Sequence, residues 1–86
     1  MTCEVLVLYF AKSSELAGVR SENLTVPRKI TSKELWEKIA ALHPGLCAIK
    51  DHIVLAVRQE YVNIGDDIIT LRPGDEIAVI PPISGG

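Results

Sequence analysis

The chain has 86 residues, of which 48% are apolar, and its nine basic and eleven acidic residues give a formal net charge of −2. This length fits one domain with a small core and excludes a two-domain enzyme, a repeat array and a large cofactor-binding fold. The charge balance argues against nucleic acid as a partner, because surfaces that bind nucleic acid are normally basic. The mean hydropathy of +0.25 is high for so small a domain, so we expect either an unusually well-packed fold or apolar surface that meets a partner.

The composition also bears on the compartment. No apolar run approaches the roughly 20 residues that a membrane helix needs, and no stretch has the form of a signal peptide. Two cysteines, Cys3 and Cys47, do not make a disulfide framework. We therefore expect a cytosolic protein without a membrane partner.

The first third of the chain predicts a hairpin. Residues 3–10 are β-branched and aromatic and predict a strand that is apolar on both faces. Residues 13–17 favour a short helical turn that ends at Gly18. Residues 21–26 predict a second strand, which Pro27 ends and which pairs with the first.

One amphipathic helix is expected next. Thr31 and Glu34 have the spacing of a capping box, in which each side chain satisfies a backbone N–H of the other residue. Pro44 disfavours helical geometry at the residue before it and so ends the helix. The apolar stripe that the helix should bury consists of Leu35, Ile39 and Leu42. A further short turn is expected near residues 46–49.

The last third of the chain alternates short strands and turns. Residues 53–57 and 76–80 predict strands, residues 61–63 predict a short one, and residues 68–71 are either a short strand or irregular. Residues 72–75 carry Pro and Gly at the central positions of a type II turn. The order of strands around one main helix indicates an α+β domain with a mixed sheet and the helix across one face, and it resembles the β-grasp, or ubiquitin-like, fold. We expect a domain over residues 1–80 and a flexible tail over residues 81–86.

Side chains for catalysis or metal binding are scarce. His43 and Cys47 are four residues apart, but Pro44 interrupts the helix between them, so we expect a helix-end histidine and a buried cysteine rather than a nucleophilic or metal site. The helical spacing of Trp36 predicts that its side chain lies in the hydrophobic core. The acidic set Asp66, Asp67, Asp75 and Glu76 lies at predicted turns, where we expect solvated residues. We predict no metal site.

The tail is the feature that points to chemistry. Its residues are Pro81, Pro82, Ile83, Ser84, Gly85 and Gly86. Two prolines favour a stiff, extended path, and six residues can reach about 20 Å at roughly 3.3 Å per residue. Because glycine has no Cβ, the terminal carbonyl is open to attack and can enter a narrow channel. The carboxylate becomes an electrophile once one oxygen is made a leaving group, for instance by adenylation.

Three segments resemble one known family. Residues 73–86, residues 7–12 and residues 55–62 are similar to the small sulfur-carrier subunits of molybdopterin synthase, in the MoaD/ThiS family, and closer to the animal form than to bacterial ones. The Gly-Asp-Glu, Pro-Pro and Gly-Gly pattern is the most specific part of this resemblance, which extends over the whole chain.

The resemblance implies a role and partners. An E1-like adenylyltransferase and sulfurtransferase would adenylate the carboxylate of Gly86 with AMP from ATP and convert it to a thiocarboxylate. The tail would enter the large catalytic subunit of molybdopterin synthase, in a heterotetramer of two small and two large subunits. There the sulfur would pass to cyclic pyranopterin monophosphate and form the dithiolene of molybdopterin. The chain would hold no permanent cofactor and would not be an enzyme on its own.

The sequence also suggests where the partner docks. Alternation along the last strand places Ile80 on the face opposite to the core. In the first strand the same alternation places Phe10 there with Leu6 and Leu8, and Tyr61 is expected beside them. We predict that Phe10, Tyr61 and Ile80 contact the large subunit. The alternative is that Leu6, Leu8 and Phe10 are covered by the chain itself.

Three other functions stay open on the residues alone. A carrier of sulfur for thiazole synthesis or transfer-RNA thiolation would have the same fold. A ubiquitin-like protein modifier would also end in Gly-Gly. An interaction domain with an inert tail would undergo no chemistry at Gly86.

Overall fold

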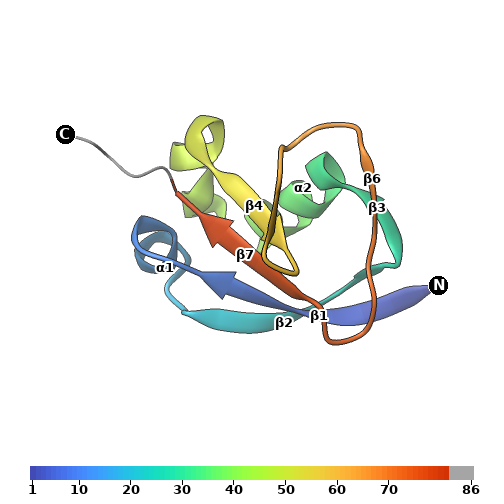
Figure 1. Ribbon diagram of the computed structural model, residues 1–86. Coiled ribbons are helices and arrows are strands. Elements are labelled where there is room, and N and C mark those ends of the chain that lie inside the picture. Colours follow the sequence, from blue (N-terminus) through green and yellow to red (C-terminus); the bar gives the residue numbers. More distant parts are fainter. Residues whose placement is uncertain (82–86) are drawn as a thin grey trace.

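A mixed sheet of five strands, in the order β2-β1-β7-β4-β5, forms the body of the molecule (Figure 1). In this computed structural model, which describes residues 1–81, β1 (Thr2–Tyr9) pairs antiparallel with β2 (Ser21–Pro27) and parallel with β7 (Glu76–Ile80). β4 (Val54–Val57) pairs antiparallel with both β7 and β5 (Glu60–Val62). The predicted hairpin and the predicted α+β, β-grasp class are confirmed.

Helix α2 (Ser32–Leu42) packs on the inner face of this sheet. It begins at Thr31, where the predicted capping box is present in both directions. Leu35, Trp36 and Ile39 are at most 1% exposed, which confirms Trp36 as core. Leu42, in the last turn, is 47% exposed, so the buried stripe ends one turn earlier than predicted.

Shorter elements complete the chain. The predicted helical turn is α1 (Lys12–Ala17), and the segment after α2 is a 3₁₀ helix, η1 (Pro44–His52), longer than expected. β6 (Ile68–Thr70) is a strand, and it pairs antiparallel with β3 (Lys29–Thr31) in a separate two-stranded sheet. β3 was not predicted, because a three-residue strand is defined by a distant partner rather than by its own pattern.

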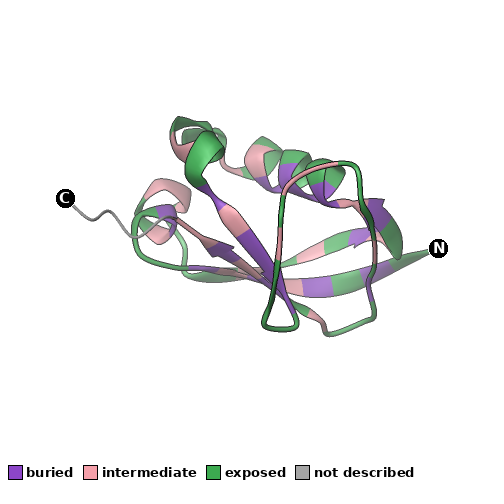
Figure 2. Ribbon diagram, turned by 45° about the horizontal axis from the view of Figure 1, so that its top comes forward, coloured by how far each residue is buried: buried purple, intermediate pink, exposed green. Residues whose placement is uncertain are grey.

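The core lies between the inner face of the sheet and α2 (Figure 2). Val5 and Val7 of β1 point into it, as do Ile77 and Val79 of β7. Each of these four side chains is at most 1% exposed, so burying them accounts for roughly 1.5–3 kcal/mol each of hydrophobic free energy before chain entropy is counted. Within residues 1–81, no helix is long and apolar enough to cross a membrane.

Candidate functional site

The tail begins at a fixed point of the sheet. Pro81 directly follows β7, which is hydrogen-bonded to β1 on one side and to β4 on the other. Because β1 and β7 run parallel, both end at the same edge of the sheet. Phe10, which directly follows β1, is therefore brought near the start of the tail, and its backbone N–H donates to the Val79 carbonyl at 3.4 Å. The other predicted tail residues, namely Pro82, Ile83, Ser84, Gly85 and Gly86, lie outside the described part of the chain.

The sheet face turned away from α2, which we call the outer face, is largely apolar. The strand register places Leu8, Ala78, Ala56 and Tyr61 in one row across four strands, and Ile80 lies opposite Val54 in the next row. The predicted outward direction of Ile80 agrees with this register, because the flanking Val79 is fully buried.

The predicted contact residues differ in how far they are exposed. Leu6, Leu8 and Ile80 are half-buried, whereas Phe10 is 48% exposed and Tyr61 is 79% exposed. Two large aromatic side chains thus stand in solvent: Phe10 near the start of the tail, and Tyr61 in β5, two strands away from β7. Whether a partner covers them stays a prediction.

A buried serine joins the end of β1 to the end of β7. The Ser13 hydroxyl accepts the backbone N–H of Phe10 at 2.9 Å. Its oxygen lies 2.7 Å from the Phe10 carbonyl and 3.0 Å from the Val79 carbonyl, and its single proton can be donated to either one. Ser13 is fully buried. This role of Ser13 could not be predicted from the sequence, because a serine in a short helix is usually solvated or caps its own helix.

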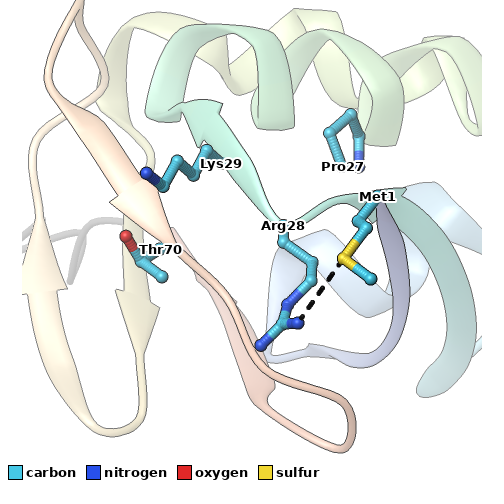
Figure 3. A pocket seen from close by; sticks show the side chains of 5 residues that line it. All are labelled: Met1, Pro27, Arg28, Lys29 and Thr70. Atoms are coloured by element: carbon cyan, nitrogen blue, oxygen red, sulfur yellow. Dashed lines mark hydrogen bonds between the residues drawn. The ribbon is translucent and has the colours of Figure 1, made fainter.

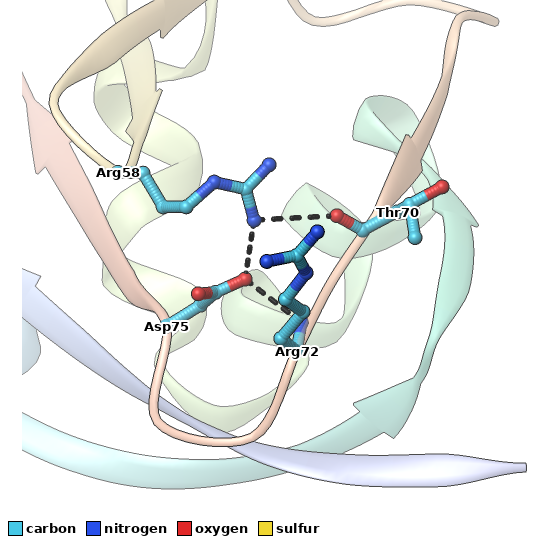
Figure 4. Close-up of polar contacts among 4 residues, drawn as sticks. All are labelled: Arg58, Thr70, Arg72 and Asp75. Carbon is cyan, nitrogen blue, oxygen red and sulfur yellow. Dashed lines mark hydrogen bonds and ion pairs between the residues drawn. The ribbon is translucent and has the colours of Figure 1, made fainter.

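At the other end of β7, an ion pair holds the hairpin that carries Tyr61 (Figure 4). The guanidinium of Arg58 contacts the Asp75 carboxylate, which also accepts the backbone N–H of Arg72 at 2.8 Å. Asp75 was expected to be solvated; its side chain is only 11% exposed, because it closes the predicted turn and contacts Arg58. That turn is confirmed by the Asp75 N–H to Arg72 carbonyl bond and by the positive φ of Gly74.

The hairpin itself has an unusual backbone. Arg58 and Gln59, the two residues between β4 and β5, have φ values of 51° and 68°. Positive φ at both central positions is the geometry of a type I′ turn, which fits the twist of a hairpin but favours Asn and Gly. The Arg58 ion pair and its N–H bond to the Glu76 carbonyl hold this conformation.

A second polar cluster links β1, β2 and the end of α2. The Tyr9 hydroxyl donates to the Glu22 carboxylate at 2.6 Å, and the same oxygen contacts Nε2 of His43, whose ring packs edge-on against Tyr9. Burial opposes ionisation of Glu22, but the hydrogen bonds from Tyr9 and His43 outweigh it and leave the pKa of Glu22 below its ordinary value. Burial, followed by the contact with Glu22, raises the pKa of Tyr9 strongly.

The two cysteines differ. Cys3 is buried, as expected, but Cys47 is exposed, so its predicted burial is wrong. The reason is that the 3₁₀ helix turns Leu46, rather than Cys47, into the core. His43 is engaged by Glu22, and among residues 1–81 no group of three His, Cys, Asp or Glu side chains could hold a metal ion.

A shallow hollow of about 390 Å³ lies at the amino-terminal end of β1 (Figure 3). Met1, Arg28 and Lys29 line it with Pro27 and Thr70. Because β1 and β7 are parallel, this hollow is at the opposite end of the sheet from the start of the tail. Neither Tyr61 nor Phe10 is among the residues that line it.

The chain matches the ThiS family over residues 7–86. It is 60% identical over 84 residues to the human "Molybdopterin synthase sulfur carrier subunit", covering 98% of this chain and 96% of the relative. The solved small archaeal modifier protein 1 of Haloferax volcanii is 25% identical with a TM-score of 0.77, covering 94% of this chain and 99% of that one. A chain of the Helicobacter pylori complex of subunits 1 and 2 of molybdopterin-converting factor has the same fold, at 22% identity and a TM-score of 0.62, covering 96% and 99%.

Proposed function

The chain belongs to the ThiS family, and on this premise we propose that it is the sulfur-carrier subunit of a molybdopterin synthase. The observation that carries the proposal is the 60% identity to the human sulfur carrier subunit over nearly the full length of both chains. The Gly-Gly end of this sequence falls within the family match, which extends to residue 86. The chain is then a sulfur donor rather than an enzyme in its own right.

The chemistry is assigned to the carboxylate of Gly86. An E1-like enzyme transfers AMP from ATP to one carboxylate oxygen, with release of pyrophosphate. A sulfur donor at the oxidation level of sulfide then attacks the carbonyl carbon, displaces AMP and leaves a thiocarboxylate, so one oxygen of the chain is replaced by one sulfur. Two chains each give one sulfur to cyclic pyranopterin monophosphate, and the two sulfurs form the dithiolene of molybdopterin. Water supplies the oxygen that returns each chain to its carboxylate.

The division into a body and a tail suits this role. Residues 1–80 form the body that a partner recognises, and residues 81–86 form the segment that delivers the reactive carbonyl. At roughly 3.3 Å per residue the six residues reach about 20 Å, enough to enter an active site that another subunit supplies. The catalytic groups then belong to the partners.

We place the large catalytic subunit on the outer face, with Phe10, Tyr61 and Ile80 in contact and two copies of each subunit in the assembly. Support comes from the exposure of the two aromatic side chains and from the existence of a complex between subunits 1 and 2 of the Helicobacter pylori factor. Aromatic residues are enriched at the centres of such interfaces. The cytosol is the compartment we propose for the assembly.

Sulfur transfer can be followed directly. The chain is first thiocarboxylated and then mixed with the large subunit and cyclic pyranopterin monophosphate. The intact mass should return to that of the carboxylate while a dithiolene forms. A chain lacking Gly86 is the matched control and should give neither change. A thiocarboxylate that persists in the complete mixture would refute the proposed transfer.

A second candidate is a ubiquitin-like protein modifier, favoured by the likeness to the small archaeal modifier protein 1. A modifier would form amide bonds between Gly86 and lysine side chains. Intact-mass analysis after incubation with the activating enzyme, ATP and cell extract distinguishes the two roles, because only a modifier would produce covalent conjugates. A carrier for thiazole synthesis or transfer-RNA thiolation would form the thiocarboxylate but would not deliver its sulfur to the pyranopterin.

A further inference from the structure

The turn after β1 needs an external restraint. Ala11 has a φ of 50°, in the left-handed region that L-residues other than glycine adopt at a cost in energy. This turn carries Phe10, whose side chain is about half exposed. A contact between this turn and the sheet therefore also restrains the backbone that carries the ring.

Ser13 supplies that contact. Its hydroxyl accepts the backbone N–H of Phe10, which directly follows β1, and lies within hydrogen-bond distance of the Val79 carbonyl in β7 and of the Phe10 carbonyl, which share its single proton. The direct bond from the Phe10 N–H to the Val79 carbonyl is long, at 3.4 Å, so the hydroxyl completes the ladder where β1 leaves the sheet. Val79 is two residues before Pro81, and the bridge therefore ties Phe10 to the base of the tail.

We propose that Ser13 is a positioning residue, whose hydroxyl fixes Phe10 against the end of β7 so that the docking surface and the tail meet the large subunit in one arrangement. This inference rests on the proposed function. Binding is strengthened when interface groups are ordered before association, because their entropy is then not lost on binding. Loss of the hydroxyl should therefore weaken association even though Ser13, being buried, touches no partner.

The neighbouring serine is a matched control. Ser14 lies in the same helix, and its exposed hydroxyl donates only to the Ala11 carbonyl, at 2.8 Å. Ser13→Ala and Ser14→Ala thus remove the same group from adjacent positions, but only the first breaks the link to β7. Affinity for the large subunit is measured by calorimetric titration, at a temperature where melting curves show both variants folded.

We expect Ser13→Ala to raise the dissociation constant about tenfold, or about 1.4 kcal/mol, and Ser14→Ala to leave it unchanged. Ser13→Thr keeps the hydroxyl and should retain most of the affinity. If the alanine variant does not fold, Ser13→Cys is used instead. This variant keeps the shape of the side chain but loses most of its hydrogen bonding.

A double-mutant cycle separates positioning from a merely structural role. Phe10→Ala should cost less affinity in the Ser13→Ala background than in the wild type, because the backbone that carries the ring is then no longer held against β7. Equal affinity of Ser13→Ala and wild type, or additive losses in the cycle, would overturn this inference alone. If the wild-type chain itself does not bind the large subunit, the proposed function fails and the inference fails with it.

Discussion

Tyr61 offers the most direct test of the docking surface. It is 79% exposed in β5, an edge strand, and lies opposite Ala56. Replacing it by alanine removes little that the folded chain buries, so stability should change by less than about 1 kcal/mol, as for other exposed positions. Any large effect on binding then reports contact with the partner rather than loss of the fold.

The size of the effect follows from the exposed area. An aromatic side chain of this kind buries about 150–250 Å² in a core or an interface, so covering the exposed part of Tyr61 removes about 150 Å² from water. At about 25 cal/mol per Å² this area corresponds to about 4 kcal/mol, as an upper limit. Ordering the side chain and desolvating its hydroxyl oppose this gain, and we expect Tyr61→Ala to cost about 2 kcal/mol, or about a 30-fold rise in the dissociation constant.

Calorimetric titration against the large subunit gives the measurement, and Ile68→Ala is the control. Ile68 is 71% exposed in β6, in the two-stranded sheet that abuts the start of α2 rather than on the outer face. Its loss should leave the affinity unchanged. If folded Tyr61→Ala binds as tightly as the wild type, or if Ile68→Ala loses as much affinity, the partner does not dock where we place it.

Two further predictions concern stability. Gln59→Gly should raise the free energy of unfolding by about 0.5–1 kcal/mol, because glycine tolerates the φ of 68° that a type I′ turn imposes; a lower melting temperature would contradict this view of the hairpin. Because the pKa of Glu22 is lowered in the folded chain, its carboxylate stabilises the fold at pH values above its ordinary pKa of 4.5. This contribution is lost as the pH falls through the lower folded-state pKa. Glu22→Gln should therefore cost stability at neutral pH and progressively less in acid, as measured by denaturant titration; a cost independent of pH would refute this assignment.

The regular part of the fold could be predicted from local patterns. The capping box at Thr31 and the apolar alternation around Val7 and Ile77 are each encoded within a few residues, and all three are present in the structure. The same alternation correctly predicted that the Ile80 side chain points away from the core. These features depend on the periodicity of a helix or a strand, which a sequence displays directly.

Features that depend on distant contacts could not be predicted. Ser13 is buried beside the end of β7, and the carbonyl of Val79, far along the chain, lies within hydrogen-bond distance of its hydroxyl. Asp75 is shielded because Arg58 reaches it from another hairpin. Cys47 is exposed because the 3₁₀ helix has a different period from the expected turn. In each case the fold, rather than the local pattern, determines the surroundings of the side chain.

The most direct test of the account is the intact mass of the chain after incubation with an E1-like activating enzyme, ATP and a sulfur donor. We predict a gain equal to the difference between one sulfur and one oxygen atom, located at Gly86 and absent from a chain that lacks this residue. A chain whose mass never changes under these conditions, or changes equally without Gly86, would contradict the assignment of this protein as a sulfur carrier.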